Sequence, residues 1–258
     1  MKVGIVAMGL LGPGLDDFAS ARPILAGQQA YARAPVTIPP STLLPANERR
    51  RTTDTIRLAL KVAEEATADS DRSSLRSVFA SSSGDMDIID RICDALTQPE
   101  PMVSPVQFHN SVHNAAAGNW SIATGNPAPA TAISGFDATL AAGLLEAATL
   151  QQTEGGEVLL AAYDVASMAT FLRVRPITEP FAVALRLGAP GSDRPTLELA
   201  LGEGREPTAC RQDALEALRA TNPAARALPL LEVLARGDEG HVTLAAPLGR
   251  SLEVRITT

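Results

Sequence analysis

The sequence predicts an α/β fold in which helices pack on a largely parallel sheet. Short apolar runs bounded by turn residues alternate along the chain with longer segments whose apolar residues recur at helical spacing. Hydrophobic residues make up 45% of the 258 residues, whereas aromatic residues make up only 3%, so the core must be aliphatic. Small aliphatic side chains close-pack well and allow helices to lie near the sheet.

Strands and helices are expected in alternation over the first 190 residues. The expected strands span 3–8, 78–80, 130–134, 157–162 and 182–187, and the expected helices span 16–25, 52–68, 86–96, 115–123 and 137–151. Asp16 is placed to cap the first of these helices.

The pattern changes beyond about residue 190. Alternation over 197–201 predicts a strand with one exposed face, and two short helices should follow at 213–220 and 228–235. Segments 241–246 and 251–256 read as a closing antiparallel pair. We therefore expect one domain over 1–190 and an extension of strands and helices over 191–258 that packs on the same domain.

Charge and cysteine content exclude several classes of protein. The net charge is −7 and the isoelectric point is about 5.0, which does not suit a nucleic-acid surface. The only basic run, Arg49 to Arg51, is either a solvated face or a receptor for an acidic carrier protein or a phosphate. Cys93 and Cys210 have no metal or redox spacing, and neither a secretory signal nor a membrane span is visible. These features predict a cytoplasmic protein without a cofactor or metal.

The turn between the strand at 130–134 and the helix that follows carries the functional argument. Its sequence is Ala-Ile-Ser-Gly-Phe-Asp-Ala-Thr over 132–139, so small residues lead directly into a helix N-terminus. Unpaired backbone N–H groups and the helix dipole favour negative charge at that position, which enzymes use to activate a nucleophilic cysteine. Here the residue is Asp137, which fits a helix cap, a pocket residue that contacts a ligand or partner, or a general base.

These segments resemble the β-ketoacyl synthases of fatty-acid and polyketide assembly, which have the thiolase-like layered fold. The resemblance covers about 70% of the chain, from the first strand to about residue 187. The resemblance rests on five segments: the opening strand and glycine turn at 3–9, the strand and loop at 80–84, the "N-x-x-A-G" helix at 109–118, the nucleophile turn at 132–139 and the strand at 157–162. It implies the N-terminal half of that fold with extra C-terminal strands. The chain is most similar to a short synthase-like family of aryl polyene pigment pathways.

The sequence departs from that family at the position of the catalytic cysteine. Asp137 stands there, and a carboxylate cannot hold an acyl thioester, so we expect no ketoacyl condensation by this chain. Moving the alignment by three residues would place Ser134 there instead. Family synthases are also about half as long again and carry two histidines in their second half, where this chain has only His241.

Other polar residues are candidates for the same site. His109 and His113 are four residues apart and are expected on one helix face, where they form a polar cluster with Asn110 and Asn114 at an interface or pocket. A metal site is not expected, because no third ligand is evident.

A second candidate group follows the strand at 157–162. Tyr163 and Asp164 stand at the strand end where α/β folds collect functional groups, and Phe136 and Ser134 flank the turn.

Three functional hypotheses follow. The first is a non-catalytic subunit, either a scaffold or a chain-length-factor-like protein, that pairs with a β-ketoacyl synthase or an acyl carrier protein. The second is an acyl-thioester decarboxylase or hydrolase that uses Asp137 with His109 or His113. The third is a homodimeric module that binds acyl chains or polyenes.

Overall fold

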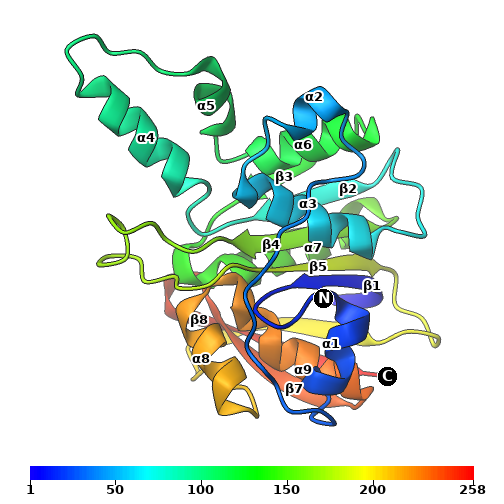
Figure 1. The fold of residues 1–258 in the computed structure, drawn as a ribbon. Coiled ribbons are helices and arrows are strands. Elements are labelled where there is room, and N and C mark those ends of the chain that lie inside the picture. The colour runs from blue at the N-terminus through cyan, green and yellow to red at the C-terminus, as the bar shows by residue number, and fades with distance from the viewer.

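The computed structural model describes residues 1–258 as one eight-stranded sheet covered by helices on both faces (Figure 1). The strand order is β3-β2-β4-β5-β1-β6-β8-β7. The strands are β1 (Lys2–Leu11), β2 (Arg76–Ala80), β3 (Ala130–Ile133), β4 (Val158–Asp164), β5 (Phe181–Gly188), β6 (Thr196–Glu203), β7 (Gly240–Ala246) and β8 (Arg250–Thr257). The helices are α1 (Phe18–Leu25), α2 (Ala46–Arg49), α3 (Asp54–Ala66), α4 (Met86–Leu96), α5 (Pro105–Asn110), α6 (Ala115–Thr124), α7 (Thr139–Glu154), α8 (Asp213–Thr221) and α9 (Leu228–Arg236), with 3₁₀ turns η1 (Phe136–Ala138), η2 (Ala224–Ala227) and η3 (Pro247–Gly249).

The sheet is mixed, so the prediction of a largely parallel sheet was wrong. Only the β2–β3 and β2–β4 pairs are parallel, and the other five pairs are antiparallel. The alternation of strands and helices holds up to β4, but β4 leads to β5 through a loop rather than a helix. The strand direction therefore reverses between β4 and β5, in the middle of the sheet.

The two central strands are buried on both faces, as their continuous apolar runs predict. Every residue of β4 and β5 is buried, because helices cover both sides of the sheet. Along β4, Leu159, Ala161 and Tyr163 face the core that contains α3 and α6. The intervening residues, such as Leu160, face the larger core that contains α7 and α9.

Helix α7 approaches the sheet very closely because of a glycine. A Cβ at Gly143 would lie 2.9 Å from the Ala80 Cβ and 2.9 Å from Leu160 Cδ1. The absent side chain lets the helix backbone rest on β2 and β4, which fixes where the N-terminal end of α7 meets the ends of those strands.

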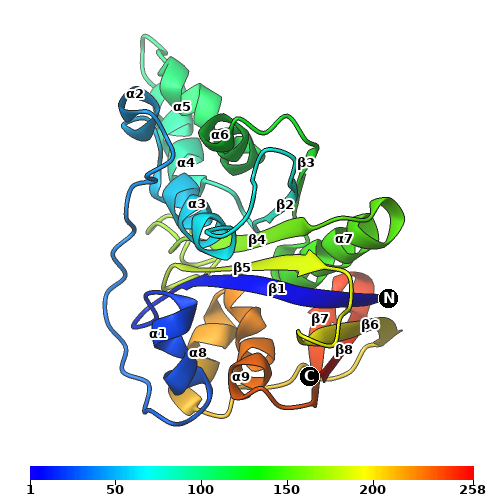
Figure 2. The same ribbon diagram turned by 90° about the vertical axis from the view of Figure 1, so that its right-hand side faces the viewer.

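The C-terminal strands extend the same sheet beyond β1 (Figure 2). β6 pairs with β1, and β7 and β8 form the expected antiparallel pair. Leu197 and Leu199 are buried while Ala200 is exposed, which agrees with the predicted one-sided strand up to that point. Leu201 should share the buried face but is exposed. The domain boundary near residue 190 stays a prediction.

Two predicted local features differ from the structure. The cap of α1 is Asp17 rather than Asp16, and its Oδ1 accepts a hydrogen bond from the Ser20 N–H at 2.7 Å. The helix expected over 115–123 is α6, but the residues before it form a separate helix, α5, and a turn at 111–114. None of the helices has the length and apolarity that a membrane crossing requires.

Candidate functional site

The turn that joins β3 to α7 places Asp137 at the corner between strand and helix. β3 ends at Ile133, and Asp137 is the middle residue of η1, the single 3₁₀ turn that leads into α7. Thr139 stabilises this turn, since its Oγ1 accepts a hydrogen bond from the Gly135 N–H at 2.9 Å and donates one to the Phe136 carbonyl at 2.7 Å. Asp137 is therefore held at the bend without its own side chain taking part in the turn.

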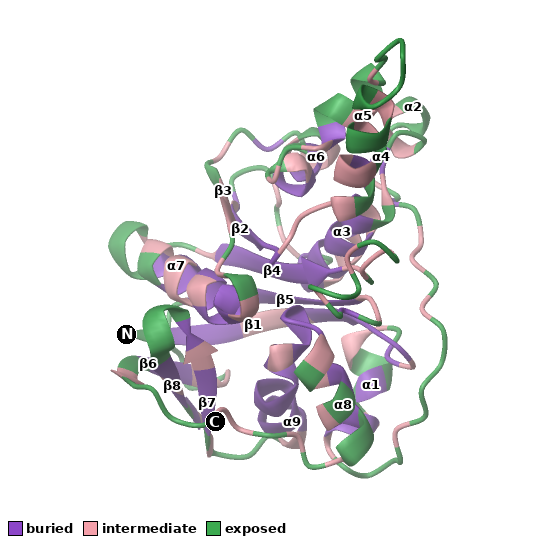
Figure 3. Ribbon diagram, turned by 90° about the vertical axis from the view of Figure 1, so that its left-hand side faces the viewer, coloured by how far each residue is buried: buried purple, intermediate pink, exposed green.

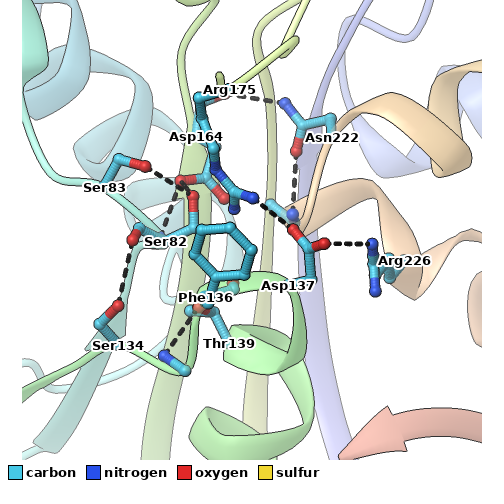
Figure 4. Close-up of polar contacts among 12 residues, drawn as sticks. Ser82, Ser83, Ser134, Phe136, Asp137, Thr139, Asp164, Arg175, Asn222 and Arg226 are labelled. Atoms are coloured by element: carbon cyan, nitrogen blue, oxygen red, sulfur yellow. Dashed lines mark hydrogen bonds and ion pairs between the residues drawn. The ribbon is translucent and has the colours of Figure 1, made fainter. Parts of the chain in front are cut away.

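The Asp137 carboxylate binds two arginines instead of capping the helix (Figure 4). No side-chain hydrogen bond caps η1 or α7, so the helix-cap interpretation is wrong. Asp137 Oδ1 lies 2.5 Å from Arg175 Nη1, and Oδ2 lies 3.3 Å from Arg226 Nη2. The side chains of Arg175 and Arg226 are only 12% and 23% exposed, against 44% for Asp137. The carboxylate is therefore the counter-charge for two mostly buried guanidinium groups.

Phe136 adds a second contact to Arg175. Its backbone φ is +54°, in the left-handed region that non-glycine residues rarely adopt. This conformation leaves the Phe136 ring exposed and places it under the Arg175 guanidinium, whose Cζ lies 3.9 Å from the ring centroid. The cation–π contact offsets part of the backbone strain, which is of order 1–3 kcal/mol.

Asp164 is a buried carboxyl group at the end of β4, beside Arg175. Its Oδ1 accepts hydrogen bonds from the Ser82 N–H, the Ser82 hydroxyl and the Ser81 hydroxyl at 2.8, 2.7 and 3.1 Å. Its Oδ2 has no hydrogen-bond partner. Burial raises the pKa of Asp164 to about 6, and the hydrogen bonds from the two serines and the charge of Arg175 offset part of that rise.

The loop from Val165 to Pro180 links the Asp137 site to a cavity of about 720 Å³. Arg175 lies on this loop, and Val165, Met168 and Ile177 of the same loop line the cavity. The opposite walls come from the start of α3, from α4 and from α5. Four carboxylates also line the cavity, namely Asp54, Asp85, Asp87 and Asp164, so its interior is not an apolar tunnel.

The two histidines do not share a helix face, which corrects the prediction from their spacing. α5 ends at Asn110, and His113 lies in the following turn. The His109 side chain is exposed, whereas His113 Nε2 lies 3.0 Å from the Ser81 carbonyl. The helix breaks here because polar side chains compete for its hydrogen bonds: the Ser111 hydroxyl donates to the Phe108 carbonyl.

The remaining predicted site residues are spread over different environments. Tyr163 is buried in the core, edge-on to Phe79, and burial raises the pKa of its hydroxyl, as does the charge of Asp164. Asn110 is buried and donates to the Arg51 carbonyl at 2.8 Å, whereas Asn114 is exposed. Ser134 is exposed just beyond β3, and its hydroxyl donates to the Ser82 carbonyl at 3.1 Å.

Sequence reasoning missed the arginines and Asn222, which complete the site. The Asn222 amide donates to the carbonyls of Asp164 and Glu179 at 3.0 and 2.9 Å, and so ties the end of β4 to the end of the 165–180 loop. Arg226 and Asn222 come from the C-terminal extension. Charged residues in loops are usually solvated, so nothing local distinguishes Arg175 or Arg226 as partners of Asp137.

His241, which is the only histidine of the second half, lies on β7. Its Nε2 is 3.1 Å from Glu253 Oε2 on the neighbouring strand β8, and its side chain is half exposed. His241 pairs only with Glu253, so it is not one of the C-terminal residues that reach the Asp137 site.

Comparison with known proteins decides the family. The model of the β-ketoacyl synthase N-terminal domain matches residues 25–246, which is most of the sequence. This chain belongs to that family. Among curated proteins, none matches the sequence.

Several solved structures have the same fold and align with this chain over almost its whole length. One is a ketosynthase in complex with its chain length factor from Xenorhabdus doucetiae, with a TM-score of 0.77, 21% identity and 99% coverage of both chains. Two more are the ishigamide ketosynthase/chain length factor, with a TM-score of 0.70 and 14% identity, and a type II polyketide synthase acyl-carrier protein in complex with its ketosynthase, with a TM-score of 0.73 and 11% identity. Both alignments cover 99% of this chain and 99% of the matched chain. The matched chains are therefore about as long as this one.

Proposed function

We propose that this chain is a non-catalytic β-ketoacyl synthase-like subunit, either chain-length-factor-like or a scaffold, in fatty-acid or polyketide-type aryl polyene assembly. The observation that carries the proposal is the state of Asp137. At the strand-to-helix corner, where the family resemblance places the nucleophile, stands a carboxylate with both oxygens bound to guanidinium groups. A carboxylate cannot form the thioester that condensation requires.

The thioester decarboxylase or hydrolase hypothesis has less support. General acid–base catalysis needs a second group within hydrogen-bond reach of the reacting proton. His109 is exposed on α5, and His113 is engaged with the Ser81 carbonyl, so neither histidine is paired with Asp137. The groups that do contact Asp137 are the guanidinium groups of Arg175 and Arg226, which only donate hydrogen bonds.

The acyl-chain or polyene binding module also has less support from the cavity. An apolar chain placed there would exclude water from the Asp54 and Asp87 side chains, which line the cavity and are 70% and 51% exposed. Removing water from charged groups is unfavourable. Native mass spectrometry of the purified protein that finds a co-purified lipid or polyene would revive this hypothesis.

A ketosynthase is the partner that we propose first. β3 is the edge of the sheet, it immediately precedes the Asp137 turn, and its four residues are small or partly exposed. An unpaired edge strand offers free N–H and C=O groups to a second subunit. In the Xenorhabdus doucetiae structure a ketosynthase is held in complex with its chain length factor, which supports an equivalent pairing here.

An acyl carrier protein is a second proposed partner, through the basic run after α2. Arg50 and Arg51 are exposed, and a carrier protein with an acidic surface would be attracted to them. Changing both to Glu should weaken carrier binding and leave ketosynthase binding unchanged, as measured by titration of each partner.

The test of the non-catalytic role is an acylation experiment. The purified protein is incubated with acyl- and malonyl-carrier thioesters, beside an active ketosynthase as positive control and Asp137→Ala as matched variant. We expect no covalent mass increase and no thioester loss above background for either form. Acylation or thioester loss that depends on Asp137 would refute the proposal.

A further inference from the structure

A short segment beside the Asp137 site makes no backbone hydrogen bond to the rest of the molecule. Residues 167–177, here called the flap, form six backbone hydrogen bonds, and each of them joins two flap residues. One of these bonds runs from the Ser167 N–H to the Ile177 carbonyl at 2.8 Å and so joins the two ends of the flap. Compact surface loops whose ends meet are frequently functional units.

The flap is also weakly packed on the body of the protein. Ile177 is its only buried residue, and the others are exposed or intermediate (Figure 3). In Figure 1 the loop that contains the flap projects beyond the ends of β4 and β5. A segment with few buried apolar contacts opens at a lower free-energy cost than the core of a protein does.

Two side chains fasten the flap to the body. Arg175 Nη1 lies 2.5 Å from Asp137 Oδ1, and the guanidinium group lies over the Phe136 ring. The Thr170 hydroxyl donates to Asp90 Oδ1 of α4 at 3.2 Å, in an exposed contact. The contact of Arg175 is an ion pair whose guanidinium is only 12% exposed, so solvent and salt screen it less. It is therefore the stronger of the two.

The chain on both sides of the flap is fixed in place. The Asn222 amide donates to the carbonyl of Asp164, where β4 ends, and to the carbonyl of Glu179, just before β5. Between these anchors and the flap lie residues 165–166 and 178, which make no backbone hydrogen bond. A few loop residues of this kind can absorb the change in backbone angles of a hinge motion.

One side of the flap faces the cavity of about 720 Å³. Ser167, Met168 and Ile177 line this cavity together with residues at the start of α3 and α4. A flap that swings away from the body would therefore remove part of the cavity wall and widen its entrance.

We propose that the flap opens over the cavity as one body, and that the ion pair between Asp137 and Arg175 is the latch that holds it closed. The carboxylate at the strand-to-helix corner then controls access to the cavity from across the flap. This role requires no partner subunit, so it can fail while the proposed function stands.

The experiment measures how fast a cysteine under the flap reacts with N-ethylmaleimide, followed by mass spectrometry of the labelled peptides. Ile177→Cys introduces the probe at the buried flap position, and Cys93→Ser removes the exposed native thiol. In this parent, Asp137→Asn removes the latch from the corner and Arg175→Gln removes it from the flap. The partly buried Cys210 near α8 reports global unfolding in the same reaction.

Three matched variants separate the latch from its surroundings. Arg226→Gln breaks the second ion pair of the same carboxylate without changing the flap. Asp193→Asn breaks an exposed ion pair elsewhere in the chain. Thr170→Ala removes only the contact between the flap and α4.

We expect both latch variants to raise the labelling rate of the probe by about fivefold or more, because losing a mostly shielded ion pair shifts the flap toward its open state. Thr170→Ala should raise the rate less than either latch variant. Arg226→Gln and Asp193→Asn should stay within about twofold of the parent. The labelling rate of Cys210 should be the same in all of these proteins.

Three results would overturn the inference. The ion pair is no latch if Arg175→Gln labels no faster than the parent, or if Arg226→Gln labels as fast as Arg175→Gln. The flap does not open on its own if the probe and Cys210 react faster together, because that pattern reports global unfolding. Should Asp137→Asn fail to fold, Arg175→Gln decides the matter, since it leaves the corner carboxylate paired with Arg226.

Discussion

Replacing Asp137 by Asn tests whether its carboxylate holds the site together. The side chain keeps its shape but loses its charge, which leaves the mostly buried guanidinium groups of Arg175 and Arg226 without their shared counter-charge. Breaking a buried pair costs about 3–5 kcal/mol and an exposed pair about 0–1 kcal/mol. Asp137 is 44% exposed, so solvent screening places the expected loss between these ranges, at about 2 kcal/mol.

For a chain of 258 residues, a loss of this size lowers Tm by about 4–8 °C, which differential scanning calorimetry resolves. The control is Asp193→Asn, because Asp193 pairs with Arg194 at an exposed site and should change Tm by less than about 2 °C. The pairing should also appear in a double-mutant cycle of Asp137→Asn with Arg226→Gln, as a coupling energy of about 0.5 kcal/mol or more. We infer that Asp137 joins the 165–180 loop and η2 to α7. That inference is wrong if the Tm of Asp137→Asn lies within 1 °C of the wild type, or if the double-mutant cycle shows no coupling energy.

Three other predictions concern the interior. Asp164→Asn should flatten the pH dependence of the free energy of unfolding. The pKa of Asp164 in the folded state, about 6, lies above its unfolded value, so the wild type loses up to about 3 kcal/mol of stability as pH rises from about 4 through 6. If urea unfolding gives the same pH profile for both proteins, this prediction is wrong. Gly143→Ala should lower the free energy of unfolding by about 1 kcal/mol, because the cost of overpacking against β2 and β4 exceeds the gain in helix propensity. The matched variant Gly118→Ala on α6, where the new Cβ meets open space, should raise it by about 0.5–1 kcal/mol in the same denaturation assay. Iodoacetamide should modify only the exposed Cys93 in the native protein, because burial raises the pKa of the Cys210 thiol; two modified cysteines without denaturant would show that reasoning to be wrong.

The histidine pair shows how far local spacing can mislead. A separation of four residues predicts one helix face only while the helix continues, and here the polar side chains of Asn110 and Ser111 form bonds outside a helical pattern. Asn110 finds its acceptor at Arg51, which is distant in sequence. Whether a polar segment stays helical therefore depends on partners that its own sequence does not contain.

The sequence by itself determined the elements and the place of Asp137. Periodicity and turn residues are local properties, so the strands, most helices and the β3-to-α7 corner follow from the order of residues alone. Only the tertiary structure decided strand direction and what the carboxylate binds. Arg175 and Arg226 lie 38 and 89 positions beyond Asp137, and a mixed sheet with an appended C-terminal extension is what brings them to it. Such pairings depend on how distant segments pack, because a charged loop residue has the same local signature whether it meets water or a buried partner.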